Sequence, residues 1–129
     1  MSLESALFTL ITSNAPVAAV MGTRLYRDFV PQDVPKPYGY YKVVNNRVPM
    51  AHSGPAGVEF GTVRYTVFDE SRAGVIALRE VIKTATSGFK GVSDGETLDA
   101  VFYREGSSSG DTESEQHWCQ FDLTVTRRV

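Results

Sequence analysis

His117 and Cys119 are the residues whose types and spacing come closest to a metal site. They lie two positions apart in a segment with strand-like alternation, so both side chains point to one face of the predicted strand. A structural zinc normally takes four such ligands, and the other candidate, His52, lies in a distant loop. A buried cysteine with a histidine at the rim of the strand is the simpler interpretation. The sequence therefore predicts no metal site.

Other catalytic and nucleotide-binding patterns are no better supported. No serine is marked as a nucleophile at a strained turn between a strand and a helix. The Gly88-Phe89-Lys90-Gly91 turn lacks the glycine spacing and the Lys-Ser or Lys-Thr of a phosphate loop. Three tyrosines could stack on nucleic-acid bases, but without a basic groove they fit a packed sheet better, namely Tyr38, Tyr40 and Tyr41. We expect no catalytic residues, no cofactor and no enzymatic activity.

The composition is that of a soluble, single-domain protein spanning residues 1–129. Thirteen basic and fifteen acidic side chains give a net charge of −2, so the global basic field of a dedicated nucleic-acid binder is missing. The single cysteine excludes an intrachain disulfide, and no apolar run approaches the length of a membrane span. We therefore expect folding in a reducing cytoplasm and no membrane partner.

Charges of opposite sign are concentrated in two regions. Five bases lie between Arg24 and Arg47, against two acids, whereas four acids and no base lie between Glu105 and Glu115. These regions could mate between neighbouring copies of the chain, or they could be two separate solvated surfaces.

Two helices and several strands are predicted from periodicity. Apolar residues at helical spacing predict a helix from Leu3 to Thr12 and another from Ser71 to Thr86. Asn14 and Pro16 begin a short extra helical turn, which Gly22 ends. Strands are predicted at residues 25–27, 38–48, 59–68, 97–104 and 118–126. Residues 106–111 are too polar and glycine-rich to bury, which predicts a mobile loop.

These elements predict an α+β fold: an antiparallel β-sheet with two main helices packed on one face and long loops. Leu98, Ala100 and Phe102 are expected to share one strand face. The sheet face away from the helices is expected to carry Trp118, Tyr103 and Phe68 among polar residues. A half-apolar sheet face on a small protein suggests a partner surface.

An ordered set of short motifs covers nearly the whole chain. Ala6-Leu7 in the first helix is followed by Gly22-Thr23-Arg24-Leu25-Tyr26 and a proline-containing approach to a tyrosine-rich strand. The turn Gly54-Pro55-Ala56-Gly57 precedes a strand that ends at an acid, then a helix and the turn Phe89-Lys90-Gly91. This order resembles the tail-completion, or tail-terminator, proteins of long-tailed phages, which are also called head–tail joining or minor tail proteins.

The resemblance implies a structural virion protein of the tail neck region that is assembled in the host cytoplasm. Such proteins cap the head-proximal end of the tail tube as hexameric rings and join it to the head connector. The implied partners are other copies of the chain, the tail tube protein and the head-completion or connector protein, with transient, non-specific passage of duplex DNA. The alternative is a small α+β ligand-binding protein or enzyme without a recognisable catalytic motif.

Two sets of residues are candidates for assembly. The segment from Arg47 to Val58 is too apolar for a purely solvated loop, yet its glycines and prolines keep it out of the sheet. We expect it to be an arm between subunits, with these interface residues: Arg47, Met50, His52 and Pro55. The acidic region is expected at the rim of the channel, or else on the solvated outer surface, through Glu105, Asp111, Glu113 and Glu115.

Overall fold

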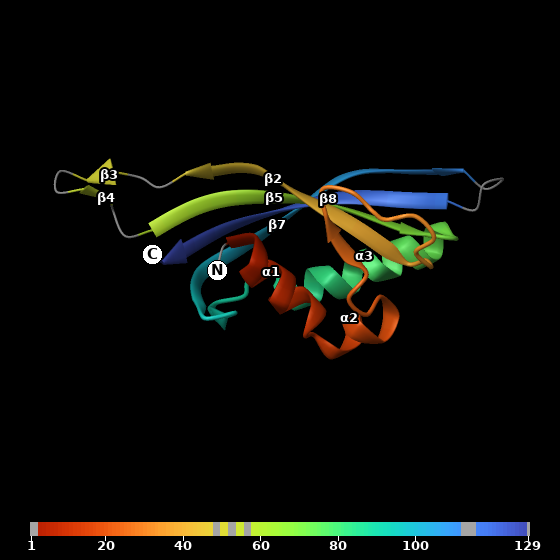
Figure 1. Ribbon diagram of the computed structural model, residues 1–129, viewed down its shortest axis with the longest axis horizontal. Coiled ribbons are helices and arrows are strands. Elements are labelled where there is room, and N and C mark those ends of the chain that lie inside the picture. Colours follow the sequence, from red (N-terminus) through yellow and green to blue (C-terminus); the bar gives the residue numbers. More distant parts are fainter. Residues whose placement is uncertain (1–2, 48–49, 52–53, 56–57, 112–115, 129) are drawn as a thin grey trace.

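A six-stranded sheet organises the computed structural model, which describes residues 3–47, 50–51, 54–55, 58–111 and 116–128 (Figure 1). The strand order is β1-β2-β5-β8-β7-β6. The strands are β1 (Leu25–Arg27), β2 (Tyr38–Arg47), β5 (Val58–Asp69), β6 (Gly91–Ser93), β7 (Glu96–Asp111) and β8 (Gln116–Arg128). A separate two-stranded sheet consists of β3 (Met50–Ala51) and β4 (Gly54–Pro55).

The main sheet is mixed, so the prediction of an antiparallel sheet is wrong at one edge. β1 pairs with β2 in the parallel direction, whereas the other neighbouring pairs are antiparallel. Parallel neighbours need a connection that returns the chain to its starting end, and residues 28–37 supply it. Arg24 holds this connection through its Nε, which donates to the carbonyl oxygen of Pro37 at 2.9 Å.

The described residues contain three helices, α1 (Leu3–Thr12), α2 (Ala15–Val20) and α3 (Arg72–Thr86). α1 and α3 are the two main helices expected, and α2 is the short helical turn expected after Asn14. The predicted starts of two helices are confirmed by their caps. The Asn14 side chain accepts a hydrogen bond from the amide of Val17, and the Ser71 hydroxyl accepts one from the amide of Gly74. Figure 1 shows the three helices on the same side of the sheet, with α3 running beneath the central strands. The chain is therefore α+β.

The core lies between this side of the sheet and the helices. Tyr65 and Phe121, at the centre of β5 and β8, are fully buried and stack with ring centroids 5.4 Å apart. Alternate residues of β8 are buried as predicted from its period: Cys119, Phe121, Leu123 and Val125. Ser93 ties the far edge to the helices, because its hydroxyl donates to the carbonyl oxygen of Ala6 at 2.7 Å.

The face assignment predicted for β7 is wrong beyond Leu98. The ladder between β7 and β8 shifts between Leu98 and Ala100, as a β-bulge does. The extra residue reverses the alternation, so Val101 is buried while the side chain of Phe102 is 64% exposed. Tyr103 consequently packs against the core and not on the open face of the sheet.

β7 also continues through residues 106–111, where a mobile loop was predicted. Ser108 to Asp111 pair with Cys119 to Gln116 of β8. A polar segment can form a strand without burying its side chains when a neighbouring strand satisfies its backbone groups. The hairpin of β7 and β8 extends the molecule at one end, and the β3–β4 sheet lies beyond the opposite end (Figure 1).

Candidate assembly surfaces

The residues considered for metal binding and catalysis do not come together. Within the described ranges, no group of three metal-ligating side chains is present. Cys119 is completely buried, with Sγ 3.8 Å from the carbonyl oxygen of Val75, and burial raises the pKa of its thiol to about 11. A thiol with so high a pKa is almost entirely protonated at neutral pH and is a poor nucleophile.

None of the described helices is long and apolar enough to cross a membrane.

The sequence Gly106-Ser107-Ser108-Ser109-Gly110 has the residue pattern of a nucleophile elbow, which was not among the predicted features. Its backbone is part of β7, and Ser108 pairs with Cys119 of β8. A nucleophile elbow requires a sharp turn from a strand into a helix. This segment lacks that turn, so the match carries no catalytic meaning.

The sheet face away from the helices carries a ladder of paired polar side chains. Arg64 donates from Nε and Nη2 to the two carboxylate oxygens of Asp122, at 2.9 and 3.3 Å. On either side of this pair, Thr62 and Thr124 are 3.2 Å apart, and Gln120 Nε2 lies 3.2 Å from the hydroxyl of Thr66. These cross-strand pairs stabilise the register of β5 against β8, and they make the centre of this sheet face polar.

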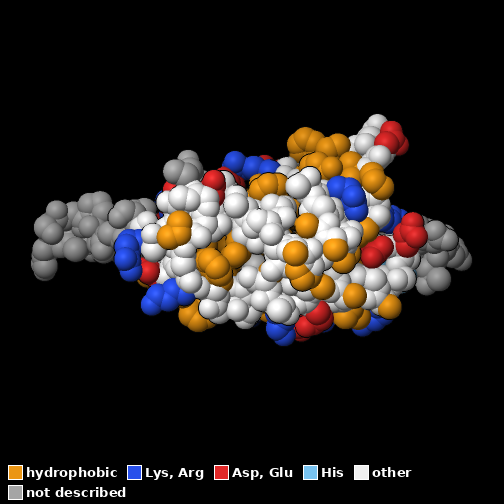
Figure 2. All heavy atoms as spheres, turned by 90° about the horizontal axis from the view of Figure 1, so that it is seen from below, with side chains coloured by type: hydrophobic (Ala, Val, Ile, Leu, Met, Phe, Trp, Pro, Cys, Tyr) orange, Lys and Arg blue, Asp and Glu red, His pale blue; other side chains and the backbone are white. Residues whose placement is uncertain are grey.

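Aromatic side chains gather at one end of this open face. Phe68 lies 5.2 Å from Tyr38 and 6.0 Å from Tyr40, measured between ring centroids, and Trp118 is its partner on β8. The half-apolar face expected from the sequence therefore contains Phe68 and Trp118, while Tyr103 is on the other side. The opposite view, onto the helices, shows hydrophobic side chains dispersed among polar ones (Figure 2).

Two depressions on the open face flank the side chain of Gln120. One, of about 330 Å³, lies between β2 and β5 and is lined by Tyr40, Lys42 and Arg64, among others. The other, of about 300 Å³, lies toward β7 and includes Arg104 and Glu105. Polar side chains line both depressions, and neither contains a nucleophile next to a general base.

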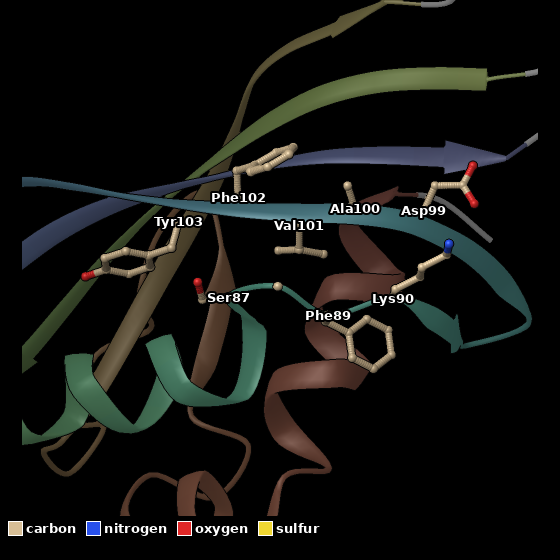
Figure 3. A pocket seen from close by; sticks show the side chains of 9 residues that line it. Ser87, Phe89, Lys90, Asp99, Ala100, Val101, Phe102 and Tyr103 are labelled. Atoms are coloured by element: carbon tan, nitrogen blue, oxygen red, sulfur yellow. The ribbon is translucent and has the colours of Figure 1, made fainter.

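A third depression lies at the edge of the sheet, between the end of α3 and β7. Its volume is about 360 Å³, and residues 87–90 and 99–103 line it. Figure 3 shows Val101 and Tyr103 pointing from β7 toward the helices, while Ala100 and Phe102 point to the opposite side. The amide of Gly88 donates to the carbonyl oxygen of Val101 at 3.0 Å and holds the two walls together.

The predicted interface residues lie on the β2–β5 side of the molecule. Arg47 is the last residue of β2, and Met50 of β3 pairs with Pro55 of β4. β3 and β4 form a small sheet outside the main sheet, while Arg47 belongs to the main sheet through β2. His52 lies outside the described residues.

Two of the four predicted acidic residues, Glu105 and Asp111, are among the described residues. Glu105 is on β7, where its carboxylate lies 3.7 Å from Arg79 and 3.8 Å from Lys83, both on α3. Asp111 is the last residue of β7, opposite Gln116 of β8. Glu113 and Glu115 lie outside the described residues. Glu105 thus contacts the helix, and five residues lie between it and Asp111 along the same strand.

A nearly buried ion cluster was not predicted. Arg127 of β8 contacts the carboxylate of Glu59 on β5 at 2.6 Å and that of Glu96 on β7 at 3.2 Å. The exposed fractions of the three side chains are 13%, 9% and 17%. The sequence signal was the alternation of β8, which places Arg127 on the same face as Cys119 and Val125.

No protein-family model and no curated protein matches this chain. Among solved structures, the chain is similar to one described as "Virion of native gene transfer agent (GTA) particle". The two share 18% sequence identity with a TM-score of 0.67, over 99% of this chain and 94% of the other. At this identity the likeness concerns the fold, and it extends over nearly all of both chains.

Proposed function

We propose that this protein is a structural virion subunit that closes the head-proximal end of a phage tail tube as a hexameric ring and joins it to the head connector. The observation that carries the proposal is the similarity in fold, over nearly the whole length of both chains, to a chain in the virion of a gene transfer agent. The ordered motifs of the sequence, which resemble those of tail-completion proteins, supply the position within the particle.

The surfaces described above support an assembly role. The open face of the sheet combines an aromatic end with a polar ladder, and a ring subunit needs such extended surfaces to contact its neighbours. The β3–β4 sheet lies outside the main sheet, where it can reach an adjoining subunit or the tail tube. This role requires neither a catalytic residue nor a cofactor.

The acidic end of the β7–β8 hairpin has a place in the same proposal. Asp111, Glu113 and Glu115 follow one another around the connection between these strands. Repeated around a ring and turned to the channel opening, they would form a negative rim that repels the phosphates of passing DNA. Glu105 contributes less to such a rim, because Arg79 and Lys83 offset its charge.

Purified particles provide the test. We expect the chain to be detected in virions by mass spectrometry and to appear in cryo-electron micrographs as a ring of six copies between tail and head. Deletion of its gene should leave tails that do not join heads or that vary in length. A chain absent from purified virions, or present in one or two copies per tail, would contradict the proposal.

A further inference from the structure

Three cations and one acid form a single row across the sheet face away from the helices. Lys42 of β2 is directly opposite Arg64 of β5, and Arg64 is opposite Asp122 of β8. Asp122 is in turn opposite Arg104 of β7. Residues paired in this way project from the same face, with their Cβ atoms about 4.5–5.5 Å apart. Asp122 offsets one of the three positive charges, so two of the three have no counter-charge in the row.

The pair of Lys42 and Arg64 is electrostatically unfavourable. Like charges directly opposite each other on neighbouring strands are destabilising, whereas opposite charges are favourable. Arg64 donates two hydrogen bonds to Asp122, but no acid among the described residues lies within ion-pair distance of Lys42. The side chain of Lys42 is exposed. An anion bound between the two cations would replace their repulsion with attraction.

Hydrogen-bond donors line the depression of about 330 Å³ between β2 and β5. Its lining includes Lys42, Arg64, Tyr40, Thr66 and Gln120, and no acid is among the described residues that line it. Gln120 donates from Nε2 to the hydroxyl oxygen of Thr66 at 3.2 Å, so the hydroxyl proton of Thr66 is still available for donation. Thr66 is only 4% exposed, and a nearly buried donor without an acceptor is costly. The depression therefore offers both positive charge and hydrogen-bond donors to an oxyanion.

The depression on the other side of Gln120 provides a comparison within the same sheet face. Its lining includes the bases Arg64 and Arg104, but also the acids Glu105 and Asp122. An anion that entered it would meet carboxylates as well as cations, and the repulsion would offset the attraction. The β2 side of the face is therefore the better place for an anion.

We propose that the depression between β2 and β5 is an oxyanion-binding site, in which Lys42 and Arg64 hold a carboxylate of an acidic protein segment. A carboxylate fits better than the phosphates of nucleic acid, because duplex binding draws on many cations and this chain has a net charge of −2. The exposed side chains of Val43 and Val44 also line the depression, where they can pack against the aliphatic part of a glutamate. The site belongs to the isolated chain, so the inference does not depend on the proposed function.

Thermal unfolding at low ionic strength tests the site, with a hexaglutamate peptide as the probe. A ligand that binds only the folded state stabilises it, so peptide at about ten times its Kd should raise the melting temperature by roughly 3–6 °C. Lys42→Gln should remove most of this rise, and Lys42→Arg should keep it. Lys90→Gln is the matched control and should also keep the rise, because Lys90 is exposed but lines a different depression. Equal rises for Lys42→Gln and Lys90→Gln would overturn the inference.

Without the peptide, Lys42→Gln should have the opposite effect on stability. The substitution removes the like charge opposite Arg64, so the melting temperature of the variant should exceed that of the unmodified protein by roughly 1–3 °C. High concentrations of sodium chloride should abolish this difference, because they screen the repulsion. A Lys42 that only stabilised the fold would lower the melting temperature when replaced, and that result would also overturn the inference.

Fluorescence anisotropy distinguishes a carboxylate from a phosphate. Labelled hexaglutamate and a labelled short duplex DNA are titrated with the purified protein at the same salt concentration. We expect the peptide to bind more tightly than the duplex, and Lys42→Gln to raise the Kd for the peptide on the order of tenfold. Tighter binding of the duplex, lost in Lys42→Gln, would assign the site to nucleic acid and overturn the inference. Particles that lack the chain would contradict the proposed function, while these titrations would still support the site.

Discussion

Arg127 offers the sharpest test of what holds the sheet together. Its guanidinium lies 2.6 Å from the carboxylate of Glu59 and 3.2 Å from that of Glu96, and so connects β5, β8 and β7 at the end of the sheet near β3 and β4. All three side chains are mostly buried. Arg127→Met keeps much of the side-chain volume but leaves two carboxylates facing each other without their cation. Breaking a buried ion pair in this way costs about 3–5 kcal/mol.

That cost is a large fraction of the total stability of a domain, which is about 5–15 kcal/mol. We expect urea unfolding, followed by the fluorescence of Trp118, to show a much lower midpoint with an unchanged slope. Arg128→Met is the matched control. Arg128 contacts Asp99 at 2.8 Å, but its side chain is 64% exposed, so its loss should cost less than about 1 kcal/mol.

A further outcome checks the cause. Replacing Glu59 and Glu96 with glutamine in the Arg127→Met background should restore most of the lost free energy, because the unpaired charges are gone. Equal losses for Arg127→Met and Arg128→Met would refute the reasoning.

Three other changes have expected outcomes. Burial raises the pKa of Cys119 to about 11, so the free energy of unfolding should fall by up to about 3 kcal/mol between pH 9 and pH 11, as the unfolded thiol ionises first. Chemical unfolding at each pH should show a shallower fall for Cys119→Ala, and identical slopes would contradict the assignment. Gly39→Ala should lower the free energy of unfolding by about 1–3 kcal/mol, because the new methyl group would lie 2.9 Å from the carbonyl oxygen of Thr66 and 2.9 Å from Val67 Cγ1. A melting temperature equal to that of the unmodified protein would show that the two strands move apart at little cost. Replacing residues 50–57 with a short Gly-Ser link should leave the circular dichroism spectrum and the melting temperature nearly unchanged, since the main sheet is intact. The same replacement should prevent the joining of tails to heads. Uniform, joined tails from such a virus would refute the proposal that this segment contacts a neighbouring subunit.

The sequence alone determined the elements whose signals are local. α3 follows from helical spacing; the sequence left Asp69 and Ser71 as candidate caps, and the structure uses Ser71. The buried face of β8 follows from strict alternation over many residues. The short α2 follows from Asn14 and Pro16. Each signal lies within one element, so no knowledge of its neighbours was needed.

The candidate surfaces depended more on tertiary structure. The sequence predicted that the segment from Arg47 to Val58 lies outside the main sheet. Its end residues belong to β2 and β5 of that sheet, whereas β3 and β4 between them form a sheet of their own. The roles of Arg47, Met50, His52 and Pro55 at an interface stay predictions. The pocket at the β7 edge could not be predicted, because it joins residues 87–90 with residues 99–103 across a turn and a bulge.

Only the tertiary structure decided the direction of β1, the reversal of faces in β7 and the extent of that strand. A bulge adds a single residue and leaves no compositional trace, yet it moved Tyr103 into the core and Phe102 out of it. Residues 106–111 are polar enough for a loop, but β8 supplied partners for their backbone groups. Strand pairing depends on segments that are distant in the sequence. The period of hydrophobic residues within one segment indicates only which face of that segment is buried, so it does not predict its partners. The sequence therefore determined the helices and the central strands, and the packing between them determined the extent of β7 and which side chains face each surface.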